Sequence, residues 1–170
     1  MQRKKRPNVA FVRAKKIKGK EYGYLVQNLW KKGKVKQVTK KYLGKIIVCE
    51  GEDGHIEANP SLSKKEFILE LLVHYFALFG FEKHPRKLAV VKDDRHIHFP
   101  SKKIMQNDKA VVLKLNERYV YSGLLSRLLD FYEPEGEDER PGTRLAQACS
   151  DIGLTIHPQS FITLYKKIYT

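Results

Sequence analysis

Residues 11–45 constrain the fold of this chain more than any other stretch of its sequence. From position 22 to position 30 the side chains alternate with a period of two, which places Tyr22, Tyr24 and Trp30 on one face. Alternation of this kind, with aromatic and β-branched residues, predicts a half-buried strand. A short hairpin connection is expected at Gly33, because glycine adopts the positive φ that such loops require. The pattern predicts a three-stranded antiparallel sheet over residues 8–16, 22–30 and 34–41.

The net charge of +14 is concentrated in the same part of the chain. Residues 1–48 hold 16 Lys and Arg residues and one acidic residue, Glu21, a balance of +15, whereas the remaining 17 basic and 18 acidic residues give −1. A one-signed region of this kind repels itself and is typical of proteins that bind a polyanion. The alternative is a solvated lysine face that only maintains solubility. An anionic membrane surface fits less well, because the basic region alternates like a strand and forms no amphipathic helix.

The basic sheet is therefore the predicted site, with nucleic acid as the predicted partner. Lysine outnumbers arginine in it, which favours contact with the phosphate backbone over reading of base edges. Tyr22 and Tyr24 are interpreted as the side of the sheet that is buried against the rest of the protein. Trp30 is left open between stacking on bases and a structural role. The predicted nucleic-acid-binding residues are Arg13, Lys15, Lys16, Lys18, Lys20, Trp30, Lys31, Lys32, Lys34, Lys36, Lys40 and Lys41.

Three short segments of this sheet carry a resemblance to a known family. They are Tyr24-Leu25-Val26, then the GKVKQ sequence of residues 33–37, then Tyr42-Leu43-Gly44. This pattern resembles the N-terminal hairpin of DDE-type insertion-sequence transposases and of small stand-alone archaeal proteins. The resemblance covers about 35 of the 170 residues and implies a shared module that faces nucleic acid. It gives no support for DNA cleavage, because the sequence lacks the hundreds of further residues that a transposase catalytic domain requires.

The remaining chain predicts an α+β body with one long core helix, short strands and C-terminal helices. The core helix is expected over residues 63–79, where Ser63 and Glu66 form a capping box and apolar residues recur at helical spacing. Strands are expected at residues 87–91, 96–99 and 110–115, and helices at 121–131, capped by Ser122, at 143–152 and at 158–168. The acidic residues 50–60 read as a linker, which divides a basic module (1–48) from the body (49–170).

Catalytic and metal-binding signals are weak. His96 and His98 would share one face of a strand near Asp93 and Asp94, but such a pair is short and common, so we predict no metal and no cofactor. Cys49 and Cys149 are isolated thiols, which favours a reducing compartment, and no apolar run is long enough to cross a membrane. A cytoplasmic location is expected. The acidic residues 133–142 are interpreted as an exposed loop, or as a regulatory mimic of nucleic acid.

The sequence thus predicts a non-enzymatic nucleic-acid-binding protein, more specifically a DNA-binding one. Two alternatives remain open. One is an RNA- or ribosome-associated subunit whose body docks a protein partner, and the other is a small metal-dependent nuclease that uses the histidine pair.

Overall fold

The computed structural model describes residues 10–132 and 142–170. Its strands form one mixed nine-stranded sheet, in chain order β1 (Ala10–Ile17), β2 (Lys20–Lys31), β3 (Lys34–Cys49), β4 (Glu82–Lys83), β5 (Ala89–Lys92), β6 (Arg95–His98), β7 (Lys103–Gln106), β8 (Lys109–Leu115) and β9 (Arg118–Val120). Its helices are α1 (Lys64–Ala77), α2 (Ser122–Leu129), α3 (Thr143–Ile152) and α4 (Pro158–Tyr169). The fold class is α+β, and the antiparallel pairing predicted for the N-terminal strands is confirmed.

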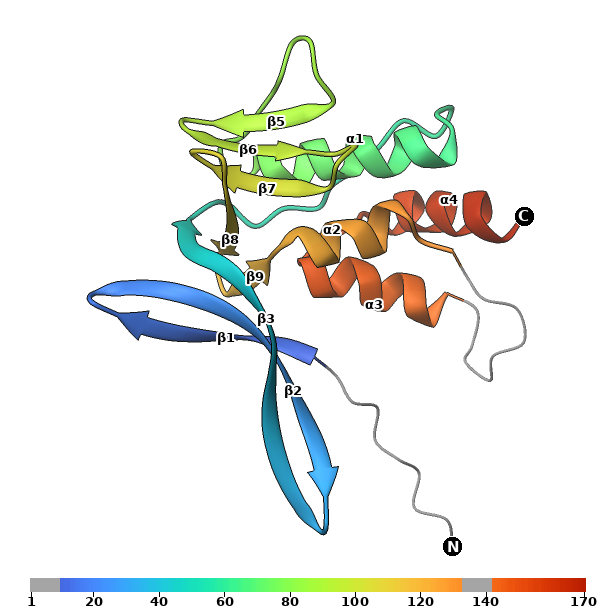
Figure 1. The fold of residues 1–170 in the computed structure, drawn as a ribbon. Helices are drawn as coiled ribbons and strands as arrows, with labels where there is room; N and C mark the ends of the chain where they lie inside the picture. The colour runs from blue at the N-terminus through green and yellow to red at the C-terminus, as the bar shows by residue number, and fades with distance from the viewer. Residues whose placement is uncertain (1–9, 133–141) are drawn as a thin grey trace, which may run out of the picture.

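The strand β3 joins the basic hairpins to the body. Its first part pairs with β2 in antiparallel fashion, and its last five residues, from Lys45 to Cys49, pair in parallel with Val111 to Leu115 of β8. Strands β4 to β8 follow one another as an antiparallel meander. Figure 1 shows the β1–β2 turn and the β2–β3 turn projecting from the body in different directions. We call β1, β2 and the antiparallel part of β3 the basic arm.

Gly44 allows the basic arm to approach the body closely. Its φ is +123°, and a Cβ atom at this position would lie 2.1 Å from the carbonyl oxygen of Ala110 at the start of β8. Gly23, the cross-strand partner of Gly44, meets the same strand, because its Cβ would lie 2.9 Å from Cγ2 of Val112. Side chains at this pair would push the arm away from β8, so the two glycines fix where the arm attaches.

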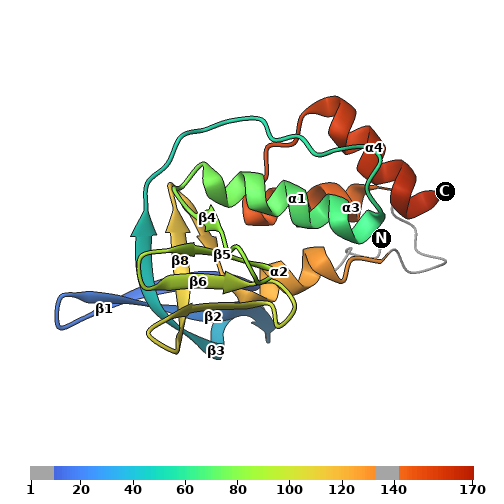
Figure 2. The same ribbon diagram turned by 90° about the horizontal axis from the view of Figure 1, so that it is seen from above.

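The hydrophobic core lies between α1 and the inner face of the meander. Val90, Ile97 and Ile104 form one row across β5, β6 and β7 and are fully buried. They belong to the same apolar cluster as Phe67 and Phe76 of α1. Figure 2 shows α1 running alongside these strands, with α4 on its far side. The body therefore has a core of its own, and the basic arm contributes little to it.

The predicted core helix and its capping box are confirmed. The Glu66 backbone N–H donates to Oγ of Ser63 at 3.4 Å, and the Ser63 backbone N–H donates to Oε2 of Glu66 at 3.1 Å. The C-terminal helices are also confirmed, including Gly153 in left-handed conformation after α3 and Pro158 in the first turn of α4. The residue at the α2 N-cap was predicted wrongly. It is Tyr121, while the Ser122 hydroxyl accepts from the backbone of Ile104 at 3.4 Å.

The acidic segment 50–60 is not a free linker, and this prediction is wrong. Ile56 in its middle is 3% exposed and forms a parallel β-bridge with Ile156. Strand β3 also continues through residue 48, where the boundary between module and body was expected. The arm and the body thus share a strand, and separate roles for residues 1–48 and 49–170 stay a prediction. The expected acidic loop covers residues 133–142, and all of it except Gly142, the N-cap of α3, lies outside the described residues.

Candidate nucleic-acid interface

Two tight turns end the hairpins of the basic arm. Lys18-Gly19 has φ values of +48° and +77°, and Lys32-Gly33 has values of +50° and +75°. Two successive positive φ angles identify type I′ turns, whose twist matches that of the flanking strands. Asparagine is the favoured first residue of such a turn, because it tolerates the left-handed region better than most side chains. Lysine occupies this strained position in both turns of this chain.

The two turns gather the lysines that lie farthest from the body. Lys16, Lys18 and Lys20 surround the first turn, and Lys31, Lys32 and Lys34 surround the second. All six side chains are exposed. Within residues 10–132 and 142–170, no lysine of β1, β2, β3 or their turns forms an ion pair with a carboxylate, whereas cations of the body do pair, as Lys102 does with Asp130 at 2.6 Å. The charges at the two hairpin tips are therefore available to an anionic partner.

The strand register divides the predicted binding residues between two faces of the arm. One set lies on the face that carries Gly23 and Gly44, and these residues are Lys16, Lys31, Lys34, Lys36 and Lys41. The other set lies with Tyr22 and Tyr24, and these residues are Arg13, Lys15, Lys20 and Trp30. Lys18 and Lys32 occupy the turns, and Lys40 is an extra residue of β3 at a β-bulge. The twelve residues therefore form no single flat surface, and they are divided between the two faces of the arm and its two tips.

Three tyrosines cluster on the open face of the arm. The ring centroids of Tyr24 and Tyr42 are 5.3 Å apart, and those of Tyr22 and Tyr42 are 6.4 Å apart. The ammonium of Lys15 lies 4.7 Å from the Tyr24 ring centroid, at cation–π distance. Partial burial and the two neighbouring tyrosines raise the pKa of Tyr42, which is nevertheless 53% exposed. The interpretation of Tyr22 and Tyr24 as buried against the body is wrong. Both rings contact Tyr42, and neither belongs to the apolar cluster of the core.

Sequence reasoning missed Tyr42 and Lys45 as members of this face. Tyr42 is the cross-strand partner of Tyr24, and Lys45 is the partner of Tyr22. Directly opposed residues of an antiparallel pair share a face. The spacing from the turn already placed Lys45 on this face, because an unbroken period of two puts it with Val35. The same period puts Tyr42 on the other face, and the β-bulge at Lys40 moves it to this one.

Arg13 is already committed to contacts inside the sheet. Its guanidinium donates to Oε1 of Gln37, and Nε2 of Gln37 donates to Oδ1 of Asn28 at 3.4 Å. This chain of polar side chains crosses all three strands and holds them in register. Arg13 therefore has a structural part in the site in addition to its charge.

Trp30 is the most exposed aromatic side chain of the arm, at 65%. It is directly opposite Val35, which is 51% exposed, and both lie next to the lysines of the second turn. A cross-strand pair of this kind stabilises the end of a hairpin. It also leaves one face of the indole open beside a cluster of cations, which is the arrangement that stacking on a base requires.

The histidine pair of β6 lies outside the arm. His96 and His98 are half-buried on the outer face of the meander, and Nδ1 of His98 is 2.7 Å from Oγ of Ser101. In the described part of the chain, no group of three or more His, Cys, Asp or Glu side chains is arranged to hold a metal ion. Both cysteines are buried free thiols, and burial raises the pKa of Cys149 to about 12, which makes it a poor nucleophile.

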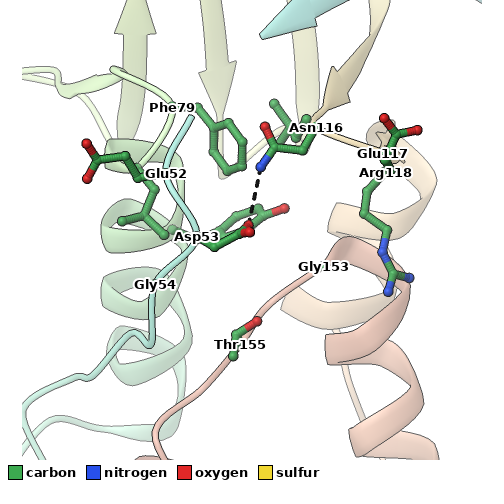
Figure 3. A pocket seen from close by; sticks show the side chains of 12 residues that line it. Glu52, Asp53, Gly54, Phe79, Asn116, Glu117, Arg118, Gly153 and Thr155 are labelled. Carbon is green, nitrogen blue, oxygen red and sulfur yellow. Dashed lines mark hydrogen bonds between the residues drawn. The ribbon is translucent and has the colours of Figure 1, made fainter. Parts of the chain in front are cut away.

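A polar pocket of about 500 Å³ lies where the parallel strands β3 and β8 end (Figure 3). Asn116 donates to Oδ1 of Asp53 at 3.3 Å, and the backbone of Gly51 donates to Oδ1 of Asn116 at 3.2 Å. Figure 3 shows the carboxylates of Glu52, Asp53 and Glu117 pointing in different directions. These carboxylates do not converge on one point, so the pocket shows no acid–base pair.

Comparison of the chain with protein-family models, with curated proteins and with solved structures finds no match in any of the three. The resemblance to transposase N-termini therefore stays a prediction. None of the helices among residues 10–132 and 142–170 has the length and hydropathy needed to span a membrane.

Proposed function

We propose that the chain is a non-enzymatic nucleic-acid-binding protein that contacts the phosphate backbone of duplex DNA through its basic arm. The observation that carries the proposal is the set of lysines on two projecting hairpin tips, which form no ion pair with any described carboxylate. Neutralisation of phosphates by such lysines releases condensed counterions and supplies sequence-independent affinity.

The length of β2 supports a duplex as the partner. It is 12 residues long, and at about 3.4 Å per residue it separates the two turns by up to about 40 Å. One turn of B-DNA measures about 34–36 Å, so the two tips match phosphates roughly one helical turn apart. A flexible single strand requires no such fixed separation.

The shape of the arm supports DNA over double-stranded RNA. The major groove of B-DNA is wide enough to admit a two-stranded β-ribbon, such as the β2–β3 hairpin. The major groove of A-form RNA is too narrow and deep for side chains to read. With Trp30 beside its tip, this hairpin is the part of the arm that fits a groove, and the β1–β2 tip then contacts the backbone.

The lysines at the two strained turn positions also support a role of the hairpin tips in binding. A left-handed conformation costs an L-residue about 1–2 kcal/mol, and asparagine would lower that cost. Strained residues that persist tend to lie at functional sites. Lys18 and Lys32 place the cation at the outermost point of each hairpin, where it first meets a polyanion.

The test is the salt dependence of binding to a duplex of about 20 base pairs. Replacing Lys34, Lys36 and Lys40 with Gln removes three exposed cations, so the slope of log affinity against log salt becomes shallower by about 2.7 if each contacts a phosphate. A control on the body replaces two lysines, Lys64 and Lys65, which are exposed at the start of α1, with Gln and should leave the slope unchanged. Equal slopes for the arm variant and the wild type would refute the proposed interface.

One observation favours the alternative of a subunit that docks on a protein or an RNA–protein particle. The arm exposes apolar side chains along its length, among them Phe11, Ile17 and Val35 at 40%, 46% and 51%. Such side chains suit a protein surface better than a phosphate backbone. Binding to an assembled particle together with no salt-sensitive binding to free duplex would favour this alternative.

A further inference from the structure

A second cationic surface lies on the body, apart from the basic arm. The outer face of the meander holds an open groove of about 440 Å³. The register places His96, His98 and Lys103 on this face, opposite the buried row that contains Ile97 and Ile104. The polar residues that line the groove are His84, Lys87, His96, His98, Ser101 and Lys103. Among the described residues that line the groove there is no Asp or Glu, and Glu82 lies at the edge of the same face, opposite Val91.

Hydrogen bonds from the backbone assign the proton in two of these histidines. The backbone N–H of Arg86 donates to Nδ1 of His84 at 3.1 Å, and the backbone N–H of Ser101 donates to Nδ1 of His98 at 3.3 Å. A backbone N–H only donates, so Nδ1 carries a lone pair in both rings. The proton of each neutral imidazole then sits on Nε2. His84 and His98 therefore line the groove as hydrogen-bond donors.

The same hydrogen bonds argue against a metal ion at these histidines. A histidine that binds a metal through one ring nitrogen donates the N–H of the other to an acceptor. In His84 and His98 the second nitrogen accepts instead, so Nε2 would have to lose its proton before it could bind a cation. Two donor imidazoles and two exposed ammonium groups, with no carboxylate among the lining residues of the described chain, suit an anion.

We propose that this groove binds a phosphate group through Nε2–H of His84 and His98 and the ammonium groups of Lys87 and Lys103. A phosphate presents several acceptor oxygens and up to two negative charges, which matches several donors from separate strands and loops. The group belongs either to a free phosphate or phosphomonoester or to the backbone of a nucleic acid. This site is independent of the basic arm, and it stands or falls separately from the proposed DNA binding.

The first test uses inorganic phosphate and the full chain. Imidazole ¹H–¹⁵N spectra at constant ionic strength report both the tautomer and the binding. We expect Nε2–H tautomers for His84 and His98, and saturable shifts of their signals at a phosphate concentration on the order of millimolar. Replacing Lys87 and Lys103 with Gln should weaken phosphate binding about tenfold, because each removes a charge-assisted hydrogen bond at a partly exposed site. Lys64→Gln with Lys65→Gln removes the same charge elsewhere and should leave the binding unchanged.

A duplex without terminal phosphates then separates the two sources. Shifts of the same histidine signals on duplex addition assign the groove to a backbone phosphate. Shifts with inorganic phosphate alone assign it to a free phosphate or a phosphomonoester. Three results would overturn the proposal: Nδ1–H tautomers at His84 and His98, no shift with either probe, or equal phosphate affinity in the Lys87 and Lys103 variant and the wild type.

Discussion

The lysines at the two type I′ turns offer a substitution that should stabilise the arm and weaken its function at the same time. Replacing Lys18 and Lys32 with Asn relieves left-handed strain, which we expect to stabilise each turn by about 0.5–1 kcal/mol. Each lost phosphate contact lowers the salt slope by about 0.9, which at about 0.1 M salt is roughly an eightfold loss of affinity. The double variant should therefore bind about sixtyfold more weakly while its hairpins open less often.

Amide hydrogen exchange in β2, beside each turn, measures the local stability, and titration with a duplex at several salt concentrations measures the binding. The matched control replaces Lys31 and Lys34 with Asn. These residues flank the second turn in strand conformation, where asparagine is disfavoured, so binding should fall without any gain in stability. An equal gain in local stability in the control would show that the stabilisation comes from relief of charge repulsion and not from the turn. Unchanged binding of the Lys18 and Lys32 variant would refute the assignment of the tips as the contact points.

Other substitutions test the attachment of the arm, its aromatic tip and the body. Gly44→Ala places a methyl group against the Ala110 carbonyl and should lower the free energy of unfolding, measured by chemical denaturation, by more than about 3 kcal/mol. Gly33→Ala has open space around it and should lower this free energy by only about 1 kcal/mol. Equal losses in the two variants would contradict the close approach of the arm to β8. Trp30→Ala removes the cross-strand contact with Val35 and should lower stability by less than about 1 kcal/mol, while it weakens duplex binding by about 1–3 kcal/mol; an unaltered affinity would assign Trp30 a structural role only. Burial raises the pKa of Cys149 to about 12, whereas the thiol of the unfolded chain has a pKa near 9. The unfolded state therefore ionises first, so the contribution of Cys149 to stability is fully present below pH 9 and is lost as the pH rises toward 12. Between pH 9 and 10 the denaturation midpoint should fall less steeply with pH in Cys149→Ala than in the wild type. Parallel pH profiles for the two proteins would contradict the burial of this thiol.

Local patterns predicted the elements that are long or have strong end signals. The alternation from Tyr22 to Trp30 and the capping box of Ser63 and Glu66 depend on neighbours in the sequence, and both appear in the structure as expected. The strands β4, β7 and β9 are two to four residues long and carry no clear period, so nothing in the sequence marked them. The parallel pairing of β3 with β8 joins residues more than sixty positions apart, and only the packed body decides it.

The arrangement of the site was less predictable than its composition. Charge counting found the lysines, but their distribution over two faces depends on the two β-bulges of β3. Lys36 and Lys41 share a face although they are five residues apart, because the extra residue Lys40 shifts the alternation between them. The same irregularity brings Tyr42 to the face of Tyr22 and Tyr24, whereas an unbroken period of two would have placed it on the opposite face. A second irregularity at Leu43 cancels the first, so Lys45 lies on the face that an unbroken period also gives it.

Trp30 provides the most direct measurement of the central claim, because it is the only tryptophan of the chain and lies beside the tip of the β2–β3 hairpin. Its fluorescence should change saturably when a duplex of about 20 base pairs is added at low salt. The change should reverse as salt is raised, with the same salt slope as the binding measured by an independent method. An unchanged emission spectrum while the duplex is bound would place the interface elsewhere on the protein. Absence of binding to any duplex at low salt would contradict the proposed function itself.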